Sequence, residues 1–318
     1  MLVLCRDKLL LLHLLIQKNN IFLHLFKRFF MGNIATDFAQ QIEKLASRGM
    51  KFDLKEDKIK EHLLDIGYYR LGFYWCPFTD KNHNFVSETK FSDVVALYYL
   101  DVDLRNILMR YINRIEINFR TKLIYYVSNK YKSFPAWFAD SAVISQNFIS
   151  NINKFYNQDF IRNNAPIKRH HAKYPNDIYA PAWKTLEFFS FGMILKIYKN
   201  LIEDNIKEEI SNLYGIKKPK KFISFMETIV LVRNTCAHSA VLFDFNTPKG
   251  ILSIPEVSFE RDNHSLFACI KVIAYILRKI SPSREKEMLH SIRSTLHKHN
   301  ENQVINSIIQ NKMKIFNL

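Results

Sequence analysis

The chain has 318 residues, of which 48% are hydrophobic and 14% aromatic, enough for a sizeable packed core. Only 7 Gly and 9 Pro are present, and this scarcity of breakers favours an all-α fold over a turn-rich β architecture. The net charge of +16 predicts a polyanionic partner, of which nucleic acid is the commonest; a Lys-rich genome bias and a membrane surface are the alternatives.

The 4 Cys residues are scattered and form no CxxC pair, which argues against a zinc ribbon. We expect reduced thiols in a cytoplasmic protein. The sequence also lacks a P-loop, a GxGxxG fingerprint and an HExxH motif, so neither a cofactor nor a metal is expected.

Residues 1–30 contain a short apolar run, residues 9–16, that His13 interrupts. This run is far shorter than the roughly 20 residues that a helix needs to span a bilayer. It is also not followed by the small-residue cleavage site of a signal peptide. We therefore expect no stable membrane insertion. Residues 1–30 are interpreted as an extension before a true start at Met31, or else as an amphipathic helix on the protein body or on a membrane.

Apolar residues at helical spacing predict most of the remaining elements. Helices are expected at residues 37–48, 57–66, 92–130, 183–200, 202–214, 220–239, 266–280 and 283–299. Residues 68–78 are predicted to be a buried aromatic turn, and residues 131–182 an irregular insertion with one weak helix at 146–157. Arginines of the long helix are expected on a solvated face (Arg105, Arg110, Arg114 and Arg120), although Glu116 and Arg120 have the i,i+4 spacing of an ion pair.

Two basic segments are candidates for contact with RNA. In the segment 168–174, expected to be a loop, Lys168, Arg169 and Lys173 could contact phosphates while Tyr174 stacks on a base. The adjacent His170 and His171 suggest a metal site, but no nearby Cys, Asp or Glu is expected to complete a ligand set.

The second segment precedes the predicted helix at 220–239. Its lysines could guide an RNA backbone: Lys217, Lys218, Lys220 and Lys221. The alternatives are a plain exposed loop for the first segment and a solvated linker for the second.

The segment 229–238, IVLVRNTCAH, carries the strongest chemical signal. In a helix, Asn234 and His238 lie one turn apart on one face, and Arg233 starts about 140° around from His238. A guanidinium, a carboxamide and an imidazole can together hold a phosphodiester and move a proton. The alternative is a helix whose Arg and His make structural hydrogen bonds, and Cys236 is interpreted as a packing residue.

This segment, followed by Leu242, Phe243 and Asp244, resembles the "RNxxAH…LWN" signature of Abi-like proteins, the AbiD/AbiF abortive-infection family within the HEPN superfamily. Four further matches lie in order from residue 41 to residue 192: residues 41–50, 66–78, 91–121 and 183–192. Val241 departs from an Arg that the family often carries, which puts an accessory phosphate contact in doubt. Asp244 conservatively replaces the family's closing Asn.

The resemblance implies a HEPN-type helical bundle over residues 31–318, with additional N-terminal helices and the motif helix at about 220–239. It implies a homodimer with an Arg–His pair from each subunit, and the apolar residues Ile229, Val230 and Val232 are expected to support that assembly. The implied activity is metal-independent cleavage of RNA by 2′-hydroxyl attack, in a growth-arresting toxin of antiphage defence. Arg233, Asn234 and His238 would be catalytic. The alternative is a non-catalytic protein that holds a small partner RNA.

Overall fold

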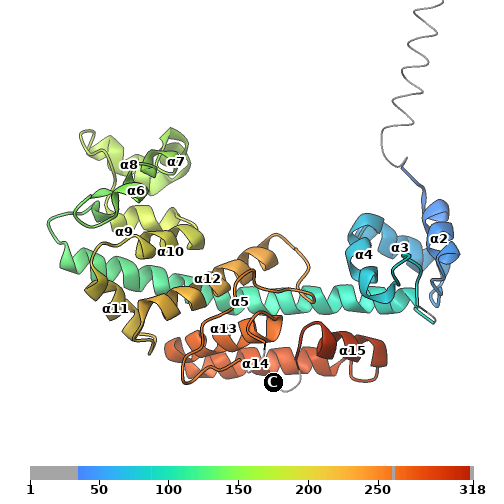
Figure 1. Ribbon diagram of the computed structural model, residues 1–318. Helices are drawn as coiled ribbons and strands as arrows, with labels where there is room; N and C mark the ends of the chain where they lie inside the picture. Colours follow the sequence, from blue (N-terminus) through green and yellow to red (C-terminus); the bar gives the residue numbers. More distant parts are fainter. Residues whose placement is uncertain (1–34, 87, 260–261, 316–318) are drawn as a thin grey trace, which may run out of the picture.

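The computed structural model describes residues 35–86, 88–259 and 262–315, which form an all-α protein (Figure 1). Within these residues, β-pairing is limited to isolated bridges such as Thr79 with Phe85. The all-α prediction is therefore confirmed. The predicted extension at residues 1–30 lies outside the described residues.

Helix α5 (Phe91–Lys130) is the axis of the molecule (Figure 1). Its 40 residues span about 60 Å at 1.5 Å per residue. Different helices pack along its length: α4 near its N-terminal end, α12, α13 and α14 in the middle, and α9, α10 and α11 near its C-terminal end. Because α5 is covered from several sides, apolar side chains such as Leu97, Leu108 and Phe119 are fully buried.

The N-terminal lobe stands at one end of α5. It consists of α2 (Phe38–Ser47), α3 (Glu56–Asp65), α4 (Tyr68–Trp75) and η1 (Cys76–Phe78). The first two predicted helices are thus confirmed, and Asp37 caps α2 by accepting a hydrogen bond from the backbone of Gln40. The predicted buried turn at 68–78 was wrong: these residues form a helix that buries Leu71, Tyr74 and Trp75.

The central lobe stands at the other end of α5 and replaces the predicted irregular insertion. It contains η2 (Trp137–Ala139), α6 (Gln146–Ile149), η3 (Ile152–Lys154), α7 (Gln158–Asn163), α8 (Ala165–Lys173), α9 (Ala182–Thr185), η4 (Leu186–Phe188) and α10 (Phe191–Lys199). Short helices packed around buried aromatic residues hold this lobe together, and Pro166 and Pro181 lie at the starts of two of them. The helix predicted at 183–200 is broken, since Ser190 caps a new helix there.

The remaining helices lie along α5, from α11 near its C-terminal end to α15 toward its N-terminal end (Figure 1). They are α11 (Asp204–Asn212), α12 (Pro219–Ala237), α13 (Leu266–Ile280), α14 (Pro282–His297) and α15 (Gln303–Asn311). Four of the five were predicted to within a few residues, and α15 was not predicted. Pro219 begins the motif helix α12, where its missing N–H has no partner to lose. In the described part of the chain, none of the helices combines the length and apolar composition that crossing a membrane requires.

Candidate functional site

His238 lies immediately after the last residue of α12, at the helix C-cap. Its backbone N–H donates to the carbonyl of Asn234 at 3.0 Å, which closes the final turn and sets the two residues on one face. Both side chains are exposed, and within the described residues the His238 imidazole makes neither a hydrogen bond nor an ion pair. The next residue, Ser239, turns the chain sharply at φ 53°. An uncommitted imidazole at such a turn is available to a ligand.

Arg233, five residues before His238 in the chain, is held by two acceptors. Its Nε lies 3.6 Å from a Glu116 carboxylate oxygen, and its terminal nitrogen donates to the Asn234 side-chain oxygen at 3.4 Å. The same Glu116 accepts a 2.7 Å hydrogen bond from Arg120, whose guanidinium also donates to the Phe189 carbonyl. One carboxylate therefore faces two guanidinium groups, which leaves a net positive charge for an anion. The predicted Glu116–Arg120 ion pair is confirmed.

A buried polar network anchors the chain that follows His238. The carboxylate of Asp101, fully buried in α5, accepts hydrogen bonds from the backbone N–H groups of Leu242, at 3.1 Å, and Phe243, at 2.7 Å. Arg105, one turn along α5, pairs with Asp101 and donates to the Ala240 carbonyl at 3.1 Å. The network thus fixes three backbone groups within five residues of His238.

Tyr74 connects this network to the N-terminal lobe. Its hydroxyl donates to Asp101 at 2.9 Å and accepts from Arg105 at 2.9 Å. Burial, reinforced by the negative charge of Asp101, raises the pKa of Tyr74 to about 12. Burial also raises the pKa of Asp101, although Arg105, Tyr74 and the two backbone donors oppose that shift. The network is therefore a tightly held, desolvated group of charges.

The solvated face predicted for the arginines of the long helix was wrong for two of them. Arg105 is 6% exposed and Arg120 is 9% exposed, whereas Arg110 lies in solvent. The sequence carried a signal for this. Asp101 and Arg105 lie four residues apart within the apolar stripe of α5, where a charged pair is buried only if its partners satisfy it.

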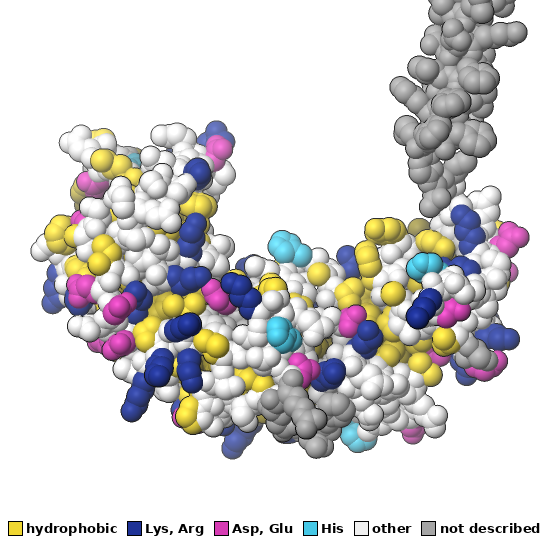
Figure 2. All heavy atoms as spheres, viewed as in Figure 1, with side chains coloured by type: hydrophobic (Ala, Val, Ile, Leu, Met, Phe, Trp, Pro, Cys, Tyr) yellow, Lys and Arg dark blue, Asp and Glu magenta, His cyan; other side chains and the backbone are white. Residues whose placement is uncertain are grey.

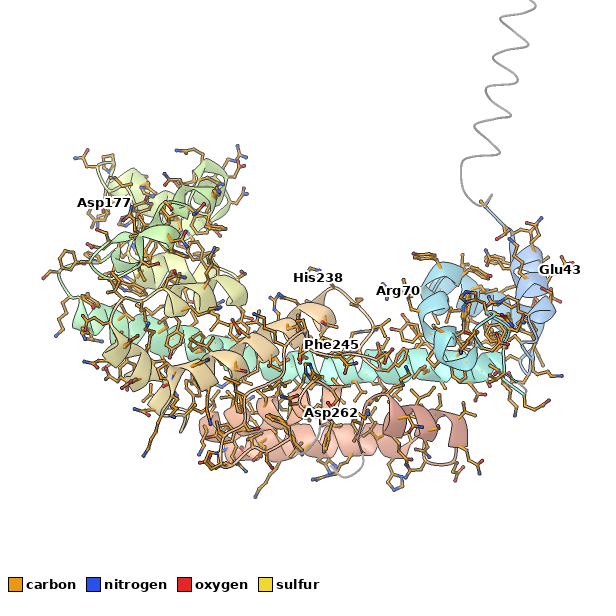
Figure 3. The ribbon with its side chains drawn as sticks, in the orientation of Figure 1. Glu43, Arg70, Asp177, His238, Phe245 and Asp262 are labelled. Carbon is orange, nitrogen blue, oxygen red and sulfur yellow. The ribbon has the colours of Figure 1, made fainter. Side chains whose placement is uncertain are left out.

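The surface is hollowed between the N-terminal lobe and the central lobe (Figure 2). His238 rises from the end of α12 into this hollow, and Arg70 of α4 lies across from it (Figure 3). Arg70 donates a 2.8 Å hydrogen bond to the carbonyl of Ser239, which ties the N-terminal lobe to the residue after His238. Sequence reasoning did not single out Arg70.

The two predicted basic segments lie away from His238. Lys217 and Lys218 precede α12, and Lys220 and Lys221 lie in its first turn, so the length of the helix, about 30 Å, separates them from His238. Lys168, Arg169 and Lys173 lie on α8 in the central lobe. The predicted loop at 168–174 was wrong: residues up to Lys173 are helical, and Lys173 stacks its ammonium 5.3 Å from the Tyr174 ring.

The adjacent histidines of α8 have structural partners. His170 is 5% exposed and its Nε2 lies 2.9 Å from the Asp177 carboxylate, which the sequence did not place beside it. His171 contacts the hydroxyl of Tyr156 at 2.8 Å. Throughout the part of the chain that the structure describes, no three His, Cys, Asp or Glu side chains are arranged to hold a metal ion.

Two residues of the motif helix pack inward. Ile229 and Val232 are fully buried within the chain, so the expectation that they support a subunit interface was wrong; Val230 is only partly buried. Cys236 is also buried, and burial raises the pKa of its thiol to about 12. A thiol that stays protonated is a poor nucleophile, in accord with the packing role expected for it.

Fold and site together define an all-α protein that presents an Arg–Asn–His set at the C-terminal end of one helix. The profile of a family described as Abi-like protein matches residues 61–244, more than half of the chain, and the chain belongs to this family. The matched span contains Tyr74, the Asp101–Arg105 pair, Glu116 and the motif. The search of curated proteins found no match, and neither did the search of solved structures.

Proposed function

We propose that this protein is a metal-independent HEPN endoribonuclease that acts in the cytoplasm in abortive-infection antiphage defence. The observation that carries the proposal is the exposed, uncommitted imidazole of His238 at the end of the helix that carries Arg233, whose guanidinium contacts Asn234 and Glu116. Membership of the Abi-like family supports the defence role, and the charge of +16 supports a polyanionic substrate.

The proposed chemistry uses protein side chains alone, from two copies of this chain. His238 takes the proton from a ribose 2′-hydroxyl, and the resulting oxygen attacks the adjacent phosphorus. The bond from phosphorus to the 5′-oxygen breaks, and that oxygen takes a proton from a second His238 imidazole as it leaves. Arg233 neutralises charge on the phosphate, and Asn234 donates a hydrogen bond to it. The products are a 2′,3′-cyclic phosphate and a free 5′-hydroxyl.

A base and an acid are both needed, which is why we propose a homodimer with two copies of the motif facing one cleft. A two-fold interface pairs the same surface on each subunit, so it would bring two His238 side chains together. The exposed Asn234 and partly buried Val230 and Leu231 on α12 are available for such a contact.

The test is cleavage of RNA by the purified full-length chain. His238→Ala should slow cleavage by about 10²- to 10⁴-fold, because that is the usual effect of a general acid–base group. His290→Ala is the matched control, since His290 is also exposed and follows Arg284 by six residues on α14, but Glu285 stands there in place of the Asn that follows Arg233. A chelator should have no effect, and products should end in a cyclic phosphate.

Cleavage at the wild-type rate by His238→Ala would reject the site, and a requirement for a metal ion would reject the mechanism. RNA that is bound but never cut by the wild-type chain would instead favour the alternative, a non-catalytic protein that holds a small RNA.

A further inference from the structure

Two aromatic side chains of α4 are left uncovered beside the candidate site. Tyr69 is 82% exposed and Phe73, one turn along the helix, is 48% exposed. Their ring centroids lie 5.4 Å apart, edge to face at 81°. We define these two residues as the α4 aromatic pair. The proposed chemistry makes no use of it.

The α4 aromatic pair is held on a rigid support. The opposite face of α4 buries Leu71, Tyr74 and Trp75 in the core, and the hydroxyl of Tyr74 is fixed by Asp101. Since the helix cannot turn without breaking these contacts, the two rings stay presented to solvent. The pair is therefore an ordered apolar surface, which gives a ligand a preformed site.

The position of the pair relative to His238 is set by Arg70. Arg70 follows Tyr69 in the chain, precedes Phe73 by three residues, and donates its 2.8 Å hydrogen bond to the Ser239 carbonyl. Figure 3 shows Arg70 across from His238, at the edge of the hollow. The aromatic pair therefore lies on the same helix turn as a cation that touches the residue after His238.

We propose that the α4 aromatic pair is the stacking site for one base of a single-stranded RNA, next to the nucleotide whose phosphodiester lies at His238. This inference rests on RNA being the substrate. Every base has a π-face that stacks on an aromatic ring, so such a site accepts any sequence. Arg70 supplies the positive charge that keeps the neighbouring phosphate close.

The size of the pair also fits a base better than a second copy of this chain. A large aromatic side chain buries roughly 150–250 Å², so two partly exposed rings offer on the order of 250 Å². A standard protein interface needs about 800 Å² from each partner. The area is therefore small for the core of a subunit interface and matches one or two bases.

The experiment measures RNA binding by fluorescence anisotropy in the full-length His238→Ala chain, using a labelled single-stranded RNA of about a dozen nucleotides. Adding Tyr69→Ala and Phe73→Ala should weaken binding by about 5- to 150-fold, the effect typical of losing one stacked base. The salt dependence should not change, because stacking displaces no counterions. Tyr69→Phe should bind like the parent, and Tyr125→Ala is the matched control, since Tyr125 is 62% exposed on α5.

A second arm replaces one base at a time with an abasic site. At one position, the abasic RNA should bind the parent chain more weakly by the same factor that the aromatic variant shows with intact RNA. Removing the two rings as well should weaken the binding of that abasic RNA no further, because the two changes delete the same contact. Binding of every RNA at parent strength by the aromatic variant would overturn the inference. If light scattering shows that the aromatic variant no longer forms a dimer while its RNA affinity per subunit is unchanged, the pair binds a second copy of this chain and the inference is overturned.

These outcomes separate the inference from the proposed function. If the rings bind RNA but the wild-type chain cuts none, the stacking site stands and the nuclease fails. If His238→Ala abolishes cleavage while the aromatic variant binds and cuts normally, the nuclease stands and the stacking site fails.

Discussion

Removing the carboxylate of Asp101 tests whether the buried network fixes the chain after His238. In the Asp101→Ala variant, the backbone N–H groups of Leu242 and Phe243 lose their acceptor. The guanidinium of Arg105, 6% exposed, loses its counter-charge and retains only the Tyr74 hydroxyl and the Ala240 carbonyl. The variant therefore leaves three buried donors without this acceptor, the N–H groups of Leu242 and Phe243 and the hydroxyl of Tyr74, and it leaves the Arg105 charge without its counter-charge.

The expected loss of stability comes from the buried donors that remain without an acceptor, and not from the net contribution of the Asp101–Arg105 ion pair. Burial raises the pKa of Asp101, so desolvation opposes its charged form and the intact pair adds little by itself. Each orphaned donor costs about 1–3 kcal/mol, and breaking a buried pair by removing one partner costs about 3–5 kcal/mol in total. We expect the free energy of unfolding to fall by that total in Asp101→Ala.

Asp101→Asn should cost less than Asp101→Ala. The amide keeps one oxygen that can accept from the Leu242 and Phe243 backbone, and it removes a charge that burial already disfavours. Glu61→Gln is the matched control, because it also removes one carboxylate but from the exposed Lys58–Glu61 pair, and it should leave stability unchanged.

The assay is urea unfolding followed by circular dichroism, with midpoints compared at a common slope. An Asp101→Ala variant within about 1 kcal/mol of the wild type would refute the reasoning, since that falls below the cost of even two orphaned donors. So would an Asn variant less stable than the Ala variant. A folded Asp101→Ala chain should also lose the proposed nuclease activity, because the segment after His238 loses the acceptor that fixes it.

Three further predictions use independent measurements. Light scattering should find a homodimer at the concentrations where RNA is cut; an active monomer would contradict the shared cleft. Neutralising the Lys and Arg residues within 217–221 or within 168–173 should reduce the slope of log affinity for RNA against log salt concentration by about 0.7 for each lost phosphate contact. If slope and affinity stay unchanged, these residues do not contact RNA and serve only to keep the protein in solution. At pH 8 the Cys236 thiol, with its pKa raised by burial to about 12, should be about 10⁻⁴ ionised and resist alkylation, while exposed Cys76 reacts; labelling of both at equal rates in the native chain would contradict this.

Local patterns in the sequence identified most of the helices. Apolar spacing placed α5 and α13 almost to the residue, because a helix that buries one face must repeat its apolar residues every three or four positions. The same reasoning failed for the segment at 68–78, where aromatic and Gly residues occur together. There the tertiary structure overrides weak local preference: α4 is helical because it buries Leu71, Tyr74 and Trp75 on the core.

The motif was visible in the sequence, but its geometry was not. Spacing placed Asn234 and His238 on one face, and the structure agrees. It did not indicate that Glu116, more than 100 residues earlier, holds the Arg233 side chain, or that Arg70 binds the carbonyl after His238. The spacing also did not show that the two basic segments lie far from His238, because distance along the chain does not give distance in space.

The sequence alone determined the helical class, the charge that attracts polyanions and the three polar residues of the motif, because these depend on composition and short-range periodicity. The tertiary structure alone decided which of those side chains are free to act. Whether a charged residue is solvated, as Arg110 is, or buried in a network, as Arg105 is, depends on which helices pack against it. His238 stands at a helix end where partners from distant segments, Asp101 and Arg70, hold the backbone that follows it while its own ring lies in solvent.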